Sequence, residues 1–259
     1  MPHYNQSMPS ANHSFWHLPA DASLHGPALD HHLLLNLWIA LALLGLAHLL
    51  LFSSLLRRRV QRPASQLVSE YLPLAAITLL FLFLGIRAEH LWGEQRYTGA
   101  DLSAMQVEVT GVQFAWYFRY PGYDAHFGLT DLSLMDAASG NPLGLDPRDP
   151  YAADDIVSSQ LVLPAGREVD LTLRSTDVIH GFAIPALRVK QNTMPGETAH
   201  IHFTPTAPGD YAILCTQVCG SGHYRMNATL RVLPPDQFNV WIAQRETAQH
   251  EATRQGAQR

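Results

Sequence analysis

One short loop near the C-terminal end of the chain carries a set of metal-binding side chains. Cys215, Cys219, His223 and Met226 fall within twelve residues, and His180 precedes them. Thiolate, imidazole and thioether groups together suit copper. A single cysteine would complete a mononuclear copper site, whereas two thiolates can bridge two copper ions. Each ion would then take one imidazole, leaving the methionine sulfur and a backbone carbonyl as weak axial ligands.

Each of these residues has a simpler interpretation when it is considered alone. Two cysteines outside the cell most often form a disulfide, and a single histidine is usually a core or surface residue. A single methionine usually fills the core. Zinc is the other metal to consider, but methionine is a poor zinc ligand, and the Cys-x-x-Cys spacing of structural zinc sites is absent. The combination favours a copper site.

Two apolar segments precede the loop and are long enough to cross a membrane. Residues 33–56 contain no charge over 24 positions; as a helix they would be about 36 Å long, against a bilayer core of about 30 Å. Residues 67–86 contain one acid, Glu70. Two buried core helices are the alternative. Because the linker holds four arginines and no acid, the positive-inside rule places it in the cytoplasm and both ends of the chain outside. These arginines are Arg57, Arg58, Arg59 and Arg62.

The first 32 residues contain six of the 14 histidines. This segment lacks the basic and apolar regions of a signal peptide. A metal-binding tail is one interpretation, but irregular spacing and scattered prolines favour a solvated tail. The six residues are His3, His13, His17, His25, His31 and His32.

From residue 104 onward the pattern changes to the alternation typical of strands, separated by Pro-Gly turn signals. Many short strands at this spacing predict a β-sandwich or a Greek-key barrel. Apolar residues at helical spacing after Pro235 predict a C-terminal helix. The candidate strands are 106–110, 160–163, 168–175, 199–203, 210–214 and 228–233. We expect a polar outside tail (1–32), a transmembrane hairpin (33–90), a β-domain (100–235) and a helical tail (236–259).

The composition agrees with a membrane protein. Of the 259 residues, 47% are hydrophobic and 15% are charged, and the net charge is −5. The charged fraction is well below the roughly 25% of soluble proteins. Intrinsic disorder and nucleic-acid binding are both disfavoured, because no long basic patch is present.

Four stretches of the sequence resemble subunit II of the haem-copper cytochrome c oxidases. They are residues 111–120, 175–182, 190–196 and 215–226, within a resemblance that covers about residues 33–245. It implies a two-helix transmembrane hairpin followed by an all-β cupredoxin domain that holds a binuclear copper centre, CuA. The copper ligands that the resemblance implies are His180, Cys215, Cys219, His223, Met226 and the main-chain carbonyl of Gln217.

The resemblance also implies a function. Such a centre takes electrons one at a time from cytochrome c or another small donor and passes them to haem in subunit I. There oxygen is reduced to water with proton translocation, so this subunit holds no catalytic residue itself. Its partners would be subunit I, subunit III and membrane lipid. The location would be the bacterial inner membrane, with the copper domain on the periplasmic face.

Three other functions are alternatives to this one. A quinol oxidase subunit II would lack the copper ligands. A haem-copper nitric oxide reductase with a CuA subunit would use the same centre. A membrane-anchored copper carrier is the alternative from a different class, although two spans argue against it because a carrier needs one anchor.

Three positions depart from the family's pattern. Gln217 replaces a glutamate that helps hold a magnesium ion at the subunit I interface, so we do not expect this chain to supply that ligand. Phe114 stands where the family has a tryptophan that accepts electrons, and Trp116 keeps the second aromatic position; both are candidates for receiving electrons. Gln66 stands where many relatives have a glutamate near a proton channel, for which Glu70 is either a replacement or a plain interfacial acid.

The segment of residues 124–155 is acidic. It contains seven aspartates and one arginine, a net charge of −6. A negative face that steers a basic cytochrome toward the protein is one interpretation. An ordinary solvated loop is the other.

Overall fold

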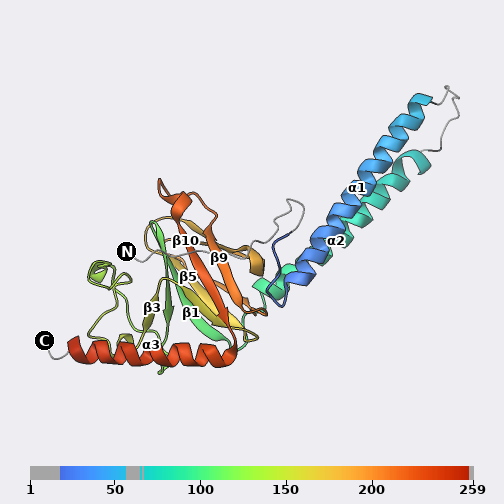
Figure 1. Ribbon diagram of the computed structural model, residues 1–259. Helices are drawn as coiled ribbons and strands as arrows, with labels where there is room; N and C mark the ends of the chain where they lie inside the picture. The colour runs from blue at the N-terminus through green and yellow to red at the C-terminus, as the bar shows by residue number, and fades with distance from the viewer. Residues whose placement is uncertain (1–17, 57–64, 66, 257–259) are drawn as a thin grey trace.

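The computed structural model describes residues 18–56, 65 and 67–256, and it consists of a helical hairpin that projects from a β-domain (Figure 1). The predicted cytoplasmic arginines, Gln66 and the first three histidines of the sequence lie outside the described residues.

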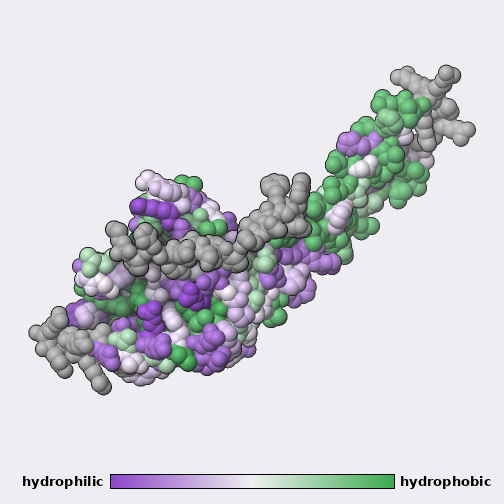
Figure 2. Space-filling model, viewed as in Figure 1, coloured by the Kyte–Doolittle hydropathy of each residue, from purple (hydrophilic) through white to green (hydrophobic). Residues whose placement is uncertain are grey.

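The hairpin is formed by α1 (Gly26–Leu56) and α2 (Leu72–Arg96), and one π-helical turn, Leu67–Tyr71, leads into α2. By length and composition both helical segments can cross a membrane, and the most apolar window of each has no buried residue. Figure 2 shows that hydrophobic side chains cover the hairpin, while hydrophilic ones gather on the β-domain. So large an exposed apolar surface requires lipid or another protein to cover it.

The β-domain is a sandwich of two five-stranded sheets, with strand orders β3-β2-β1-β5-β8 and β4-β10-β9-β6-β7. β1 pairs with β5, and β4 with β10, in parallel; the other pairs are antiparallel. The first sheet contains β1 (Met105–Val112), β2 (Ala115–Tyr120), β3 (Ile156–Ser158), β5 (Val169–Ser175) and β8 (Ala199–Phe203). The second contains β4 (Leu161–Pro164), β6 (His180–Ile184), β7 (Val189–Thr193), β9 (Gly209–Cys215) and β10 (Asn227–Leu233).

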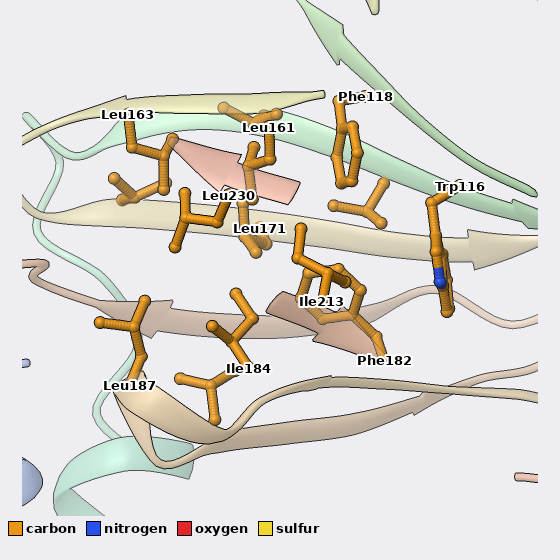
Figure 3. Packing of buried hydrophobic residues seen from close by; sticks show 14 of the residues in the cluster. Trp116, Phe118, Leu161, Leu163, Leu171, Phe182, Ile184, Leu187, Ile213 and Leu230 are labelled. Atoms are coloured by element: carbon orange, nitrogen blue, oxygen red, sulfur yellow. The ribbon is translucent and has the colours of Figure 1, made fainter. Parts of the chain in front are cut away.

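The core lies between the two sheets, where side chains such as Phe118, Leu171 and Ile213 are fully buried (Figure 3). Helix α3 (Pro235–Gly256) lies across one end of the sandwich (Figure 1). It is held there by its first turns, because Phe238 is buried and the Trp241 ring lies 5.4 Å from the ring of Tyr120.

The expected fold class, a hairpin followed by an all-β cupredoxin domain, is confirmed. Each of the six candidate strands overlaps a strand of the structure. Four further strands, β2, β3, β6 and β7, were not among the candidates. β3 has only three residues, and every residue of β6 is buried, so neither shows the polar–apolar alternation of a half-buried strand.

Residues 18–25, here called the strap, differ from the expected solvated tail, because they bind the β-domain. Ala22 is 1% exposed. Its N–H donates to the carbonyl of Ala186 over 2.9 Å, and its carbonyl accepts from Thr206 N–H over 2.8 Å. Ser23 Oγ accepts the N–H of Gly26 over 3.0 Å and caps the helix. Helix α1 therefore begins seven residues before the predicted span.

Two arginines join the hairpin to the β-domain. Arg188 forms a bidentate ion pair with Asp30 of α1, at 2.7 Å to each carboxylate oxygen. Arg96, at the end of α2, donates to the Lys190 carbonyl over 2.6 Å and to the side chain of Gln191. Both helices are thus attached to the edge of the domain that contains β7.

Candidate metal centre

The metal-binding loop connects β9 to β10. β9 ends at Cys215 and β10 begins at Asn227. The N–H of Cys215 donates to the carbonyl of Met226 over 3.2 Å and closes the base of the loop. The first and last predicted ligands of the loop, Cys215 and Met226, are therefore fixed beside each other at the adjoining ends of β9 and β10.

His180 reaches this loop through strand pairing. It is the first residue of β6, which runs antiparallel to β9 with Phe182 opposite Cys215. Thr216 N–H, just after β9, donates to the carbonyl of Gly181 over 2.8 Å. His180 itself is fully buried. The fold thus brings together residues that are far apart in the sequence.

The sulfur of Cys219 lies at the centre of the donor set. It is 3.8 Å from Cys215 Sγ, 3.7 Å from His223 Nδ1 and 3.7 Å from Met226 Sδ. One ring nitrogen of His180 and the two cysteine sulfurs all lie within 4.8 Å of one another. The side chains that sequence spacing singled out therefore converge on one point.

The backbone of Gln217 faces the same cluster. Its carbonyl oxygen lies 3.2 Å from Cys215 Sγ, whereas the residue as a whole is exposed. Any chemical contribution of Gln217 to the cluster therefore comes from the main chain, which every residue type supplies.

The imidazole of His180 is oriented as a metal ligand would be. Its Nε2 lies 2.8 Å from Asp177 Oδ1. Because a carboxylate only accepts, Nε2 carries the proton and Nδ1 has the free lone pair. Nδ1 is buried without a hydrogen-bond partner among the described residues. A buried orphan nitrogen is costly unless a ligand uses it, and a carboxylate behind the ring is the usual support of a metal-binding histidine.

Hydrogen bonds keep Asp177 ionised. Burial alone would raise the pKa of its carboxyl. The bond from His180 and the backbone N–H groups of Gln113 and Val178 outweigh that effect and hold the pKa below its usual value.

Cys215 and Cys219 are free thiols rather than a disulfide. Burial raises the pKa of the Cys219 thiol to about 11, and the neighbouring Cys215 adds to the shift. At neutral pH the metal-free thiol is therefore protonated, and a metal ion must displace this proton to bind the sulfur.

Packed aromatic side chains support His180 on the side that faces the core. The Trp116 ring lies 5.8 Å from the His180 ring and 5.3 Å from Phe182, against which it packs edge-on (Figure 3). Gly111 completes this packing, since a Cβ there would lie 2.8 Å from His180 Cδ2. The ring is therefore confined on several sides.

The two aromatic candidates for receiving electrons differ in exposure. Trp116 is 1% exposed and cannot touch a donor protein directly. Phe114 is half-buried and packs on the metal-binding loop, where a Cβ on Gly222 would lie 2.4 Å from its ring. The Arg225 guanidinium lies 5.6 Å from the centre of the same ring. Of the two aromatic residues, Phe114 is the one that reaches the surface.

Sequence reasoning missed two supporting residues. Asp177 stands three positions before a candidate ligand, and that short spacing was the available signal for its role. Gln113 donates its side-chain amide to the Cys219 carbonyl over 2.5 Å and its backbone N–H to Asp177 over 2.7 Å. No pattern in the sequence pointed to Gln113, because its role depends on how β1 and β2 pack against the loop.

Residues 105–233 match the family model for the periplasmic domain of cytochrome c oxidase subunit II. The chain is a subunit II-type protein. The match contains all ten strands of the sandwich and every residue of the metal-binding loop. As a subunit II-type protein with two apolar helices, the chain is a membrane protein with an outer domain.

Two curated relatives of this subunit II-type protein show the extent of the likeness. An alternative cytochrome c oxidase subunit 2 from Bradyrhizobium diazoefficiens is 36% identical over 154 residues, which are 59% of this chain and 55% of that protein. Cytochrome c oxidase subunit 2 from Synechocystis is 29% identical over 142 residues, 55% of this chain and 33% of the relative. The matched region thus spans about half the first relative and a third of the second.

Among solved structures, the periplasmic domain of cytochrome oxidase subunit II from Bradyrhizobium japonicum is 23% identical to this subunit II-type protein. The alignment covers 56% of this chain and 94% of that domain, with a TM-score of 0.41.

Proposed function

We propose that the chain is the CuA subunit of a haem-copper cytochrome c oxidase. The observation that carries the proposal is the convergence of two free thiols, a thioether and two imidazoles on one loop. This donor set suits copper. The ligands are His180 through Nδ1, Cys215, Cys219, His223 and Met226, with the main-chain carbonyl of Gln217.

Copper held by these residues would accept and release one electron at a time. The chain's own residues hold the ligands still during that exchange. Asp177 fixes the tautomer and the direction of His180, while Trp116 and Phe182 exclude water from the side of the ring that faces the core. A rigid, pre-oriented ligand set is what a fixed redox site requires.

Electrons arrive from a small donor such as cytochrome c at the exposed side of the loop. Val218 and Tyr224 are 78% and 84% exposed there, and Ile179 beside His180 is 42% exposed. These apolar side chains surround a polar site, as expected of a surface for brief docking. Phe114, packed against the same loop, is the aromatic group placed to receive the electron.

The hairpin anchors the copper domain to the catalytic part of the complex. Its uncovered apolar surface fits lipid and the membrane helices of subunit I, with subunit III as a further partner. The arginine-rich linker supports a cytoplasmic loop and therefore a periplasmic copper domain on the bacterial inner membrane.

The decisive test is to purify the membrane complex that contains the full chain and supply it with reduced cytochrome c. We expect oxygen consumption that is lost in a Cys215→Ser/Cys219→Ser double variant, in which haem content is unchanged. Reduction of nitric oxide instead of oxygen would assign the chain to a reductase. A copper protein that purifies without any haem-bearing partner would contradict the proposal and indicate a carrier.

Asp177 is expected to set copper affinity without touching the metal. Asp177→Ala removes the acceptor for His180 Nε2, so copper affinity should fall by about 10- to 100-fold in a competition titration against a chelator. The matched control is Asp170→Ala, since Asp170 contacts the exposed His200 at 3.5 Å. Equal affinities in the two variants would show that the carboxylate does not support the ligand.

The side chain of Gln217 is expected to be unnecessary for copper binding. Unlike a glutamate at this position, it is also expected not to bind magnesium. Gln217→Ala should keep its copper, since only the backbone carbonyl faces the cluster. A neutral amide binds a hard divalent cation poorly. In complexes from cells grown on manganese, we expect an ordered manganese spin signal only in Gln217→Glu. Such a signal in the wild type that disappears in Gln217→Ala would contradict this.

The aspartates of segment 124–155 divide into structural and exposed groups. Asp154 and Asp155 are buried, so they cannot form a surface for a donor. Asp131 and Asp136 are exposed, and each accepts a backbone N–H two residues ahead, from Ser133 and Ala138, which tightens a turn. Figure 1 shows the segment on the side of the β-domain away from the hairpin. Steering by this segment therefore depends on its exposed members.

We expect an Asp131→Asn/Asp136→Asn double variant to lower the association rate of a basic cytochrome roughly two- to fivefold at low salt. Asparagine retains the turn-forming oxygen and removes only the charge. Turnover of the wild-type complex should fall as salt is raised, and the dependence should be flatter in the variant. Asp101→Asn is the control, because Asp101 forms the same kind of turn with Ser103 next to the hairpin. Identical salt profiles would leave the segment as a solvated loop.

A further inference from the structure

A cavity of about 360 Å³ lies where the hairpin meets the β-domain. Three separate parts of the chain line it: the junction of the strap with α1, the end of α2, and the sheet edge formed by β8. Its polar side chains include His25, Glu94, Glu168 and His202. The copper ligands contribute nothing to this cavity.

His202 presents a ring nitrogen without a hydrogen-bond partner in this cavity. Its Nδ1 lies 2.8 Å from Glu168 Oε1. The carboxylate can only accept, so Nδ1 donates and Nε2 keeps its lone pair. Nε2 is buried and has no hydrogen-bond partner among the described residues. Like His180, His202 thus has one ring nitrogen bonded to a carboxylate and the other ring nitrogen buried without a partner.

His25 also lines the cavity and is hydrogen-bonded through one of its two ring nitrogens. Its Nε2 lies 3.1 Å from the carbonyl of Leu187, which can only accept. Nε2 therefore carries the proton, and Nδ1 has the lone pair that could bind a metal ion. Burial lowers the pKa of His25 and outweighs the opposing effects of the Leu187 carbonyl and Asp21, and nearby His202 adds slightly to the lowering. The neutral imidazole is the form that binds metals.

Glu94 supplies a carboxylate from the end of α2. Its side chain is 60% exposed and forms an ion pair at 3.4 Å with the exposed His90 on its own helix. Such a contact contributes little to stability, so rotation of the side chain into the cavity that it lines is inexpensive. Glu168 stays behind His202 as the supporting acid.

We propose that this cavity binds a divalent transition-metal ion of the zinc type through His25 Nδ1, His202 Nε2 and the Glu94 carboxylate. Two imidazoles and one carboxylate form a common three-ligand set for zinc, with water in the fourth position. The two glutamates make the cavity attractive to cations and unattractive to phosphate groups. The ion ties the strap, α2 and β8 together and fixes the copper domain on its membrane anchor.

The test uses the full chain in detergent with copper already bound, and zinc as the probe. We expect one zinc per chain whose X-ray absorption spectrum contains nitrogen and oxygen neighbours and no sulfur. Affinity should fall at least about tenfold in His202→Ala and in His25→Gln, and about 10- to 100-fold in Glu168→Gln. Unchanged copper absorption bands in each variant show that it is folded and that zinc has not displaced copper.

His200→Ala is the matched control. His200 lies on the same strand and also contacts an acid, Asp170, but it is exposed and lies outside the cavity. Zinc should bind this variant as it binds the wild type. Equal zinc affinity in His200→Ala, His202→Ala and His25→Gln would overturn the proposal, because the zinc would then be held elsewhere. Sulfur around the bound zinc would overturn it as well.

Discussion

Cys219→Ser is expected to lower the copper content of the full chain from two ions to one. Cys219 Sγ is the atom that contacts every other sulfur donor and His223 Nδ1 at 3.7–3.8 Å. A serine hydroxyl is a hard, protonated group that does not bridge two copper ions. Metal analysis should give one copper, and the electron-spin spectrum should show hyperfine coupling to a single nucleus instead of two.

Met226→Leu is the comparison for this variant. The methionine is buried and its sulfur is a weak ligand, so leucine of similar volume should leave two copper ions with altered band positions. Two copper ions in Cys219→Ser, or zinc in freshly isolated wild-type protein, would contradict a thiolate-bridged pair.

Arg119→Leu is expected to cost the β-domain about 3–5 kcal/mol of unfolding free energy. Arg119 is 1% exposed and pairs with Glu108 at 2.9 Å and with Asp155 at 2.5 Å; it also donates to the Gly128 carbonyl. Leucine leaves Asp155 buried without its counter-charge, and Glu108 keeps only its contact with the partly exposed Arg174. Thermal unfolding followed by circular dichroism should show a Tm lower by roughly 6–20 °C.

Arg174→Ala separates this effect from simple loss of charge. Arg174 also contacts Glu108, at 3.3 Å, but its side chain is 47% exposed. An exposed ion pair contributes about 1 kcal/mol at most. If Arg174→Ala and Arg119→Leu lowered Tm equally, burial of the pair would not be the cause.

The candidate metal-binding loop could be identified from the sequence because its candidate ligands are close together in the chain. Four side-chain ligands lie within twelve residues, and their types narrow the metal before any fold is known. The fifth, His180, lies well before the loop in the sequence. Its position beside the loop depends on the register of β6 against β9, which is a long-range property. The proton on its Nε2 depends on the position of Asp177 in space.

Other features were not predictable because distant segments determine them. Asp154 and Asp155 look like any other members of an acidic run, yet Arg119 and backbone N–H groups hold them in the interior. Helix α1 begins before its apolar stretch because Ser23 caps it. The sequence predicted a solvated strap since no single residue in it has a strong structural preference, and backbone hydrogen bonds to the β-domain define its path.

The strap has a consequence for work with a soluble fragment. A fragment that begins near residue 100 would contain every proposed copper ligand but would lack the N-terminal chain that covers one edge of the sandwich. Three backbone hydrogen bonds, from Ala22 and Leu24 N–H and to the Ala22 carbonyl, would be missing. Each contributes about 0.5–1.5 kcal/mol. Leu187 and Pro205, both buried in the whole chain, would become more exposed to solvent. A fusion that supplies residues 18–25 through a flexible linker restores that edge.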